Sequence, residues 1–318
     1  MNKSLAQSCV LVTGGAGFIG SHIVRRLIDE KAYVRVVDNV STGQLARVRD
    51  FGHSVEFLHA DLADSGVAEE AVRGMDYVLH QAAVPSVQRS IKDPIETNRA
   101  NVTATLNLLE ACRKQGVRRI VYAASSSAYG DTEILPKREV MAPNPLSPYA
   151  LQKFIGERYC KLYFELYGLE TISLRYFNVF GAGQDPHSEY SAVIPRFITR
   201  LLLNETLVVH GDGEQSRDFT HVENVVEANL LALKATEASG NVCNIGCGER
   251  ISLNRLIDML EEILGIEANV SYVAFRSGDV RHSLADITLA RRLLAYEPKM
   301  MVKDGLRRTV DAFKSVIL

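Results

Sequence analysis

The sequence has almost no excess charge of either sign and no long apolar run. Its 36 lysines and arginines face 38 aspartates and glutamates, which gives a formal net charge of −2. Without a basic excess or a run of like charge, the chain is not expected to bind nucleic acid. No stretch approaches the roughly 20 apolar residues that a membrane-spanning helix needs. The run Val10–Val12 is too short for a secretory leader, so no membrane partner is expected.

Cysteines are also few, and they are scattered. An odd number of dispersed cysteines argues against a disulfide framework and for reduced thiols in the cytoplasm. Cys243 and Cys247 are four residues apart, but no further Cys or His flanks them at the spacing of a zinc site. We therefore expect a cytoplasmic protein without a metal site.

The first half of the chain alternates short apolar runs with helical patterns, which predicts βαβ units and a parallel sheet covered on both faces. The expected strands are Cys9–Thr13, Val34–Asp38, Val55–Ala60, Tyr77–Gln81, Arg119–Ala124 and Thr171–Tyr176. The expected helices are Gly20–Lys31, Val67–Arg73, Thr97–Gln115 and Ser147–Tyr167. The fold class is α/β, with a Rossmann-like doubly wound parallel sheet.

The pattern changes after Asn178 and predicts a smaller α/β lobe, since 318 residues are too many for one compact core. Its expected elements are the helices Val193–Leu203, Ser252–Leu264, Ile287–Leu294 and Leu306–Ile317 and the strands Leu207–His210 and Val270–Ala274. The helix His221–Ala238 is expected to pack back on the first lobe. The predicted division is 1–177, joined by about 218–242, and a substrate lobe of 178–217 and 243–318.

A glycine-rich turn between the first strand and the first helix predicts a dinucleotide site. Gly14 and Gly17 allow a tight turn whose N–H groups approach a pyrophosphate at the helix N-terminus, and Gly20 allows close helix packing. Asp38 ends the second strand, where a carboxylate accepts hydrogen bonds from ribose hydroxyls and repels a 2′-phosphate. The sequence therefore favours NAD over NADP, against an ordinary turn with a solvated aspartate.

Further cofactor contacts are placed by topology, because ligands bind at the carboxyl ends of parallel strands. Asp61 and Leu62 end the third strand, near the adenine, and small residues at the end of the fourth strand would let the backbone run beside the cofactor. The remaining expected contacts in this part of the chain are Phe18, Ile19, Asn39, Gln81, Ala82 and Ala83.

Tyr149 and Lys153 are four residues apart at the start of a helical stretch, so they share a face. An ammonium and an oxidised nicotinamide both favour phenolate, which would take a proton from a sugar hydroxyl as hydride leaves the same carbon. The alternative is two ordinary residues of an amphipathic helix. Ser125, Ser126 and Ser127 end the fifth strand, and one of them would relay the proton, with Ser125 favoured, while others would only cap or turn the chain.

With these motifs, the chain resembles the extended short-chain dehydrogenase/reductase family and, within it, the UDP-hexose 4-epimerases. The resemblance covers nearly the whole chain. It rests on the glycine turn, the Tyr149/Lys153 pair, the Ser125–Gly130 segment and the motifs Arg175–Gly181 and Arg217–Phe219. It implies C4 inversion of a UDP-sugar through a 4-keto intermediate with tightly bound NAD.

The resemblance also implies roles for single residues. Ser125 is the catalytic serine, and Phe177 and Asn101 border the cofactor. The implied UDP contacts are Asn178 and Arg217 at the diphosphate, Arg276 at the phosphates, Asp279 at the ribose, and Val193, Val208 and His210 around the uracil. A homodimer through a four-helix bundle is implied, formed by the helices Thr97–Gln115 and Ser147–Tyr167. Ile155, Tyr159, Leu162 and Leu166 would line that seam or face the sheet.

The serine triplet separates subfamilies. Sugar 4,6-dehydratases carry an Asp-Glu pair where this chain has Ser126 and Ser127, and decarboxylases of this fold usually carry Glu at the Ser127 position. Without an acid, elimination has no evident proton donor. Epimerisation or decarboxylation of UDP-glucuronate stays an alternative, although glucuronate epimerases tend to differ around Asn178. A binding protein that senses NAD without chemistry is the alternative from another class, but such proteins usually lack the Tyr/Lys pair.

Ser283 bears on the sugar. Family members restricted to glucose and galactose commonly carry a bulky Tyr there, and Ser opens space for an N-acetyl group at C2. The segment 276–283 resembles bacterial enzymes that prefer UDP-N-acetylglucosamine and UDP-N-acetylgalactosamine. Near Ser86, however, Pro85 stands where the closest of those enzymes have Gly, so use of both acetylated and plain hexoses stays open.

Overall fold

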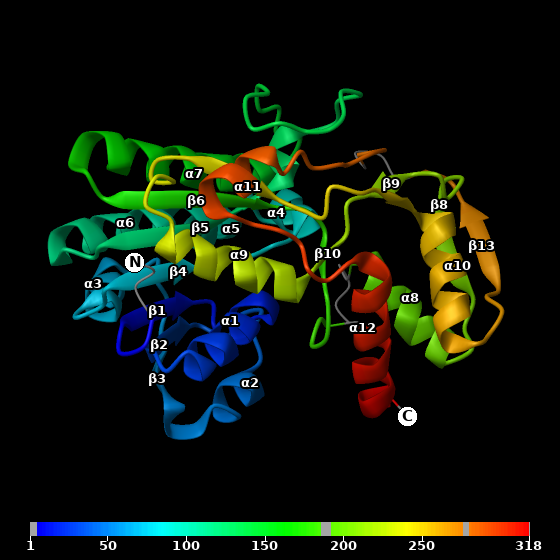
Figure 1. Cartoon of the computed structure of the whole chain (residues 1–318), viewed down its shortest axis with the longest axis horizontal. Helices are drawn as coiled ribbons and strands as arrows, with labels where there is room; N and C mark the ends of the chain where they lie inside the picture. Colours follow the sequence, from blue (N-terminus) through cyan, green and yellow to red (C-terminus); the bar gives the residue numbers. More distant parts are fainter. Residues whose placement is uncertain (1–4, 186–191, 276–279, 318) are drawn as a thin grey trace.

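A seven-stranded parallel sheet forms the centre of the larger lobe (Figure 1). The structure is a computed structural model that describes residues 5–185, 192–275 and 280–317. The sheet order is β11-β6-β5-β4-β1-β2-β3. Its strands are β1 Cys9–Thr13, β2 Tyr33–Asp38, β3 Val55–His59, β4 Tyr77–His80, β5 Arg119–Ser125, β6 Glu170–Tyr176 and β11 Val242–Ile245. The predicted Rossmann-like fold is confirmed.

Helices cover both faces of this sheet. One face holds α1 Phe18–Asp29, α9 Val222–Lys234 and α11 Thr288–Leu294, and the other holds α3 Ser65–Val72, α6 Ala104–Gln115 and α7 Pro148–Tyr167. Val10 and Val12 of β1 pack with the first group, and Leu11 packs with the second. A strand buried on both faces must be apolar throughout, which explains the continuous apolar runs. Short helices α2 Leu45–Arg49, α4 Val87–Lys92 and α5 Pro94–Asn98 lie in the connections.

The smaller lobe lies beside the sheet and has its own apolar core (Figure 1). It is built from α8 Val193–Leu202, β8 Leu207–His210, α10 Leu253–Leu264, β13 Val270–Val273 and α12 Val302–Ile317. β8 and β13 pair in parallel. Two further short pairs join β7 Val179–Phe180 with β10 Thr220–His221 and β9 Ser216–Arg217 with β12 Ile251–Ser252, and Phe180 and Ile251 lie in the core of the smaller lobe.

The chain crosses between the lobes more often than expected. As predicted, α9 packs back on the larger lobe, against α1. The predicted substrate lobe of 243–318 is too wide, however, because β11 pairs with β6 and α11 packs on β11 and α9. The buried Asn244 interrupts the apolar pattern of β11, so this strand was not predicted.

Three predicted helices begin or continue differently in the structure. The first begins at Phe18, ahead of Gly20, and the last begins at Val302, ahead of Leu306. The expected helix Thr97–Gln115 is interrupted by a π-helical turn at Arg99–Thr103 between α5 and α6. Such turns frequently lie at functional sites. Periodicity did not reveal this turn, because α5, the π-helical turn and α6 follow one another without a break and read as one helical stretch.

Candidate functional site

Two adjoining cavities lie where the strands of the large sheet end. The larger has a volume of about 1000 Å³ and the smaller about 480 Å³. Asn178, Val179, Ala192, Arg217 and Val280 line both. The predicted cofactor residues that line the larger cavity are Gly14, Gly17, Phe18, Ile19, Gly20, Asp38, Asn39, Asp61, Leu62, Gln81, Ala82, Ala83, Tyr149 and Lys153. Residues far apart in the sequence thus meet at one sheet edge.

The glycine turn packs so closely against neighbouring backbone that side chains would not fit at two of its positions. Gly14 has φ +69°, and a Cβ there would lie 2.7 Å from the Ala82 nitrogen. A Cβ on Gly20 would lie 2.1 Å from the Gly14 oxygen. The N-terminus of α1 therefore faces the cavity with a bare backbone, which is the arrangement that binds a phosphate.

Asp38 lies beside this turn and is nearly buried. Its Oδ2 accepts from the Ala16 N–H at 2.9 Å and its Oδ1 from the Val40 N–H at 2.7 Å. Burial raises the pKa of Asp38, and these two N–H groups oppose the rise. Arg35, three residues before Asp38, pairs with Glu56 and adds no positive charge at the Asp38 carboxylate. Each Asp38 oxygen keeps a lone pair for a hydroxyl donor.

Asp61 stands at the end of β3 in a charged setting that sequence alone did not suggest. Its Oδ2 lies 2.9 Å from the Arg99 guanidinium and its Oδ1 accepts from the Ala63 N–H. Asn39 also bonds to its side chain. The carboxylate is thus held at the cavity rim by groups from three segments.

Tyr149 and Lys153 lie on the first turns of α7, which Ser147 caps by accepting from the Ala150 N–H. Lys153 is almost fully buried, donates to the Ala123 carbonyl at 2.7 Å and lies 4.9 Å from the centre of the Tyr122 ring. Burial lowers the pKa of Lys153 to about 8.

Burial opposes the phenolate at Tyr149 that an ammonium and an oxidised nicotinamide together were expected to favour. Burial raises the pKa of Tyr149, and a hydrogen bond with the Ser125 side chain opposes the rise. The Lys153 ammonium is directed at the Ala123 carbonyl. Desolvation of a phenolate therefore outweighs the stabilisation that the chain itself supplies.

The serines at the end of β5 have distinct contacts. Ser125 Oγ accepts from the Ser127 N–H at 3.2 Å and from the Ser127 hydroxyl at 2.8 Å. Its own proton is therefore available for Tyr149. Ser126, Ser127, Ser86 and Ser283 also line the larger cavity. Ser86 caps α4 and accepts from the Arg89 N–H.

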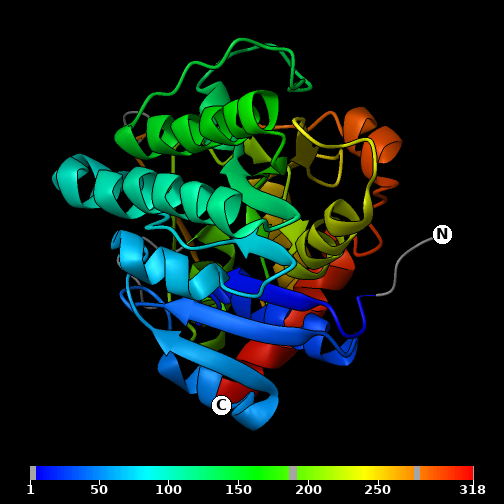
Figure 2. The same ribbon diagram turned by 90° about the vertical axis from the view of Figure 1, so that its left-hand side faces the viewer.

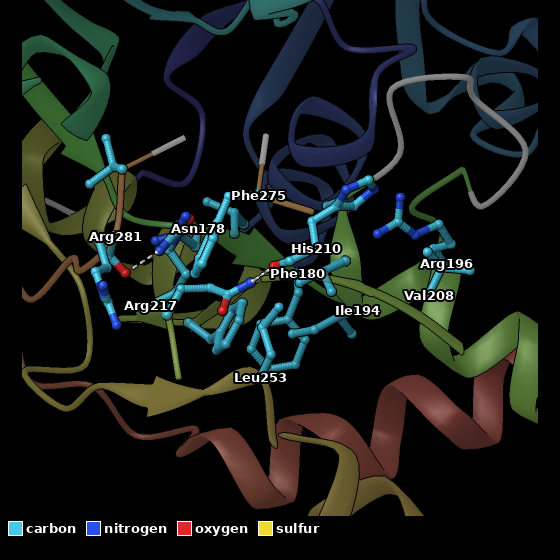
Figure 3. A pocket seen from close by; sticks show the side chains of 16 residues that line it. Asn178, Phe180, Ile194, Arg196, Val208, His210, Arg217, Leu253, Phe275 and Arg281 are labelled. Atoms are coloured by element: carbon cyan, nitrogen blue, oxygen red, sulfur yellow. Dashed lines mark hydrogen bonds between the residues drawn. The ribbon is translucent and has the colours of Figure 1, made fainter. Parts of the chain in front are cut away.

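The smaller cavity extends the site into the second lobe (Figure 3). Val193, Val208 and His210 line it, as expected for one binding region. Asn178, with φ +28°, donates to the Asp218 carbonyl at 3.2 Å, and Arg217 donates to the Arg281 carbonyl at 3.0 Å. The two predicted phosphate contacts thus lie where the cavities meet.

Some predicted residues are not on either cavity wall. Phe177 and Asn101 are buried behind it. Asn101 accepts from the Val84 N–H at 2.8 Å and donates to Gln152 at 2.8 Å, so it supports the wall from the π-helical turn. Arg276 and Asp279 lie outside the described residues.

Comparison with known proteins identifies the family. The model of the NAD dependent epimerase/dehydratase family matches residues 10–246. The chain belongs to this family. It is 40% identical over 308 residues to a putative UDP-glucose 4-epimerase of Methanocaldococcus jannaschii, covering 96% of this chain and 98% of that relative. A UDP-glucuronate 4-epimerase of Thermodesulfobacterium geofontis is 33% identical over 317 residues, with 96% of both chains covered.

A solved structure of similar fold is the UDP-N-acetylglucosamine 4-epimerase from Methanobrevibacter ruminantium, in complex with UDP-N-acetylmuramic acid. Its TM-score is 0.94 at 39% identity, and the match covers 98% of this chain and 99% of that chain. These likenesses confirm three predictions: the resemblance to UDP-hexose 4-epimerases, NAD as cofactor and an isomerase activity. No helix in the described ranges is long and apolar enough to cross a membrane, and no metal-binding cluster occurs in them.

Sequence reasoning missed several residues that line this family site. Arg47 bonds to the carbonyls of Ala16 and Gly183 and lies near Asp38. The buried Lys137 and Tyr176 line the larger cavity, and Phe275 lines the smaller. Phe275 borders the segment 276–283, which was singled out. Arg47 and Lys137 reach the site only through tertiary packing, so no local motif reveals them.

Proposed function

We propose that this epimerase interconverts UDP-N-acetylglucosamine and UDP-N-acetylgalactosamine, with UDP-glucose and UDP-galactose as a second pair. One observation carries the proposal. Ser283, a small residue, lines the same cavity as Tyr149 and Ser125. A hexose whose C4 lies at Tyr149 would then find space at that wall for an acetamido group. The name of the similar methanogen structure is consistent with this choice.

The residues present fit NAD. Gly14, Gly17 and Gly20 line the cavity at the N-terminus of α1, where a pyrophosphate would meet free N–H groups, and the oxygens of Asp38 suit two ribose hydroxyls. Lys153 and Tyr149 would hold the nicotinamide ribose and Asp61 the adenine end. Bound there, NAD would accept a hydride from the sugar C4 and return it, so that the sugar passes through a 4-ketone.

The proton chemistry belongs to the chain. Tyr149 would take the C4 hydroxyl proton and give it back, with Ser125 donating a hydrogen bond that stabilises the phenolate. Lys153 would supply a nearby positive charge. Ser126 and Ser127 offer no acid, which favours reversible oxidation over elimination.

The UDP group would be held away from the reacting carbon. Asn178 and Arg217, where the cavities meet, would bind the diphosphate, and Val193, Val208 and His210 the uracil end. Arg276 and Asp279 stay predictions for the same ligand. With UDP held and the hexose making few contacts, the 4-keto sugar could rotate and present its opposite face to the cofactor.

The test is stereochemical. Purified protein supplied with UDP-N-acetylglucosamine should form UDP-N-acetylgalactosamine without net NADH release. Ser283→Tyr should lose the acetylated pair and keep UDP-glucose and UDP-galactose. Accumulating NADH would point to a dehydrogenase, and an unchanged substrate profile in the variant would remove Ser283 as the determinant.

UDP-glucuronate 4-epimerisation is a second candidate, favoured by one observation. Lys137 is buried on the cavity wall, and its backbone N–H bonds to the Leu284 carbonyl beside Ser283. A cation there would attract the carboxylate of a uronic acid. Inversion of UDP-glucuronate, lost in Lys137→Met but not in Ser283→Tyr, would support this candidate. Release of carbon dioxide would support a decarboxylase.

We also propose that two copies pair through α6 and α7, which lie side by side on one face (Figure 2). Of the predicted seam, Leu162 and Leu166 are exposed, whereas Tyr159 packs towards the sheet. Leu151 and Tyr167 of α7 are exposed as well. Such an apolar stripe on α7, with α6 beside it, is suited to a four-helix bundle about a two-fold axis.

A further inference from the structure

Asp218 is the member of the Arg217–Phe219 motif that neither the cofactor site nor the UDP site uses. It is 0% exposed. Its carboxylate accepts three backbone hydrogen bonds, from the N–H groups of Cys247 at 2.7 Å, Gly248 at 3.0 Å and Ala285 at 3.1 Å. Cys247 and Gly248 follow β11 of the large sheet, whereas Ala285 belongs to the segment that carries Ser283. One side chain thus joins the large sheet to a wall of the substrate cavity.

The backbone around Asp218 holds the other proposed substrate contacts. Its carbonyl accepts from the Asn178 side chain at 3.2 Å. The preceding residue, Arg217, lies beside Ser216, whose carbonyl accepts from the Ser283 N–H at 3.0 Å. Each proposed substrate contact is therefore tied to the same buried aspartate. Asn178 bonds to its carbonyl, Arg217 precedes it in the chain, and Ser283 lies two residues before Ala285, which bonds to its carboxylate.

The space around this carboxylate is filled. A Cβ on Gly246 would lie 2.8 Å from Asp218 Oδ2 and 2.7 Å from the Ala285 Cβ. On the other side, the Gly246 carbonyl accepts from the Tyr296 hydroxyl at 2.9 Å. Gly246 therefore leaves no room for Ala285 to move closer to the sheet, and this packing sets the distance between the sheet and the segment that carries Ser283.

The Asp218 carboxylate is ionised at the pH values at which it would need to accept all three hydrogen bonds. Burial raises the pKa of Asp218 to about 6, against the three N–H groups that lower it. The carboxylate is thus ionised at neutral and mildly alkaline pH. Only an ionised carboxylate offers acceptors for all three donors, because an amide or a protonated acid turns one position into a donor.

We propose that Asp218 is a positioning residue that fixes Ser283, Arg217 and Asn178 relative to the proton-transfer residues and so sets affinity and selectivity for the UDP-sugar. The proposal rests on the proposed function of the cavity. Asp218 touches no substrate in this scheme. It acts through the backbone that carries the substrate contacts.

The experiment compares wild type, Asp218→Asn and Gly246→Ala, each with its bound NAD, at pH 8. Calorimetry gives the Kd of UDP-N-acetylglucosamine and of UDP-glucose, and turnover gives KM and kcat. We expect Kd and KM for the acetylated sugar to rise at least tenfold in both variants. The preference between the two sugars should change, while NAD content and kcat stay within about threefold. The matched control, Asp304→Asn, removes an exposed carboxylate paired with Arg307 on α12 and should change little.

An unchanged Kd and sugar preference in either folded variant would overturn the proposal, and so would a parallel loss of NAD binding and UDP-sugar binding, which indicates a general folding role. Should Asp218→Asn fail to fold, Gly246→Ala decides the question, because it keeps the carboxylate and moves only the contact. The proposed function fails separately, if wild type inverts no UDP-sugar. The binding measurement still tests Asp218 in that event.

Discussion

Lys153 is a buried lysine whose ammonium form is disfavoured by desolvation. With 4% of the residue exposed, burial lowers its pKa to about 8, so the ammonium predominates below that pH and the neutral amine above it. If the ammonium supports the Tyr149 phenolate, kcat should fall as pH rises through about 8, by about tenfold per further unit. Initial rates of epimerisation between pH 6.5 and 10 measure this.

Lys153→Arg is the matched control for that profile. A guanidinium stays charged throughout this range, so the variant should be slower at pH 7 and show no fall near pH 8. Circular dichroism at pH 10 separates the loss from unfolding. A wild-type profile that stays flat to pH 10 would contradict the role of the ammonium.

Ser125 and Ser126 are neighbours with different surroundings, which makes them a matched pair. Ser125 bonds to Tyr149, and its oxygen is held by Ser127, whereas Ser126 only lines the cavity. Ser125→Ala should lower kcat about 100-fold, as loss of a positioned proton-transfer group does, with little change in KM. Ser126→Ala should lower it less than tenfold. Equal losses in the two variants would assign the relay to neither serine in particular.

For single residues, the sequence predicts those that belong to a local motif. It does not predict properties that depend on how distant segments pack together. Gly14, Tyr149 and Ser125 follow directly from a turn, a helical spacing and a strand end. The raised pKa of Tyr149 depends on burial by several segments, and no spacing encodes that. Asn101 was placed beside the cofactor but lines neither cavity, and its side chain bonds to Val84 and Gln152 behind the wall, contacts that only the fold reveals.

Helix α7 approaches the sheet closely at one position. Gly156 faces Tyr122, and a Cβ there would lie 2.3 Å from the Tyr122 oxygen. Tyr122 in turn lies under the Lys153 ammonium. Gly156→Ala should therefore push the helix or the ring aside, lowering the free energy of unfolding by about 1–3 kcal/mol and kcat by about tenfold. Chemical denaturation and turnover test this, with the exposed Arg158→Ala as control. Normal activity in a destabilised variant would show that Lys153 tolerates the shift.

Among the elements, continuous apolar runs predicted strands that are buried on both sides, because such strands need no alternation. The strand β11 was not predicted because the polar Asn244 interrupts its apolar run. That side chain is satisfied by Tyr129, Lys137 and Asp286, which come from distant parts of the chain. A polar residue in a buried strand is acceptable only when such partners exist, and partners are not visible before the fold is known.

The whole molecule joins two lobes through several crossings, and this explains both the success and the error in the predicted division. The change of pattern after Asn178 precedes Phe180 and Ile194, which lie in the core of the smaller lobe. Returns of the chain through α9, β11 and α11 depend on which apolar face finds which partner. A helix period reveals that a face is apolar but not what covers it.

The outer face of α6 and α7 bears on the assembly as a whole. Leu162 and Leu166 are exposed there, and burial of such a stripe in a second copy would hide apolar surface that a monomer leaves in water. Wild type should therefore have twice the chain mass of 35.2 kDa in light scattering at micromolar concentration. Leu162→Glu should shift it to the single mass, because the two-fold axis would bring two unpaired carboxylates into an apolar seam. Val316→Glu, which places the same charge at an exposed apolar position of α12, should leave the double mass unchanged. A wild-type chain of single mass, or a Leu162→Glu protein of double mass, would show that this face is not the contact.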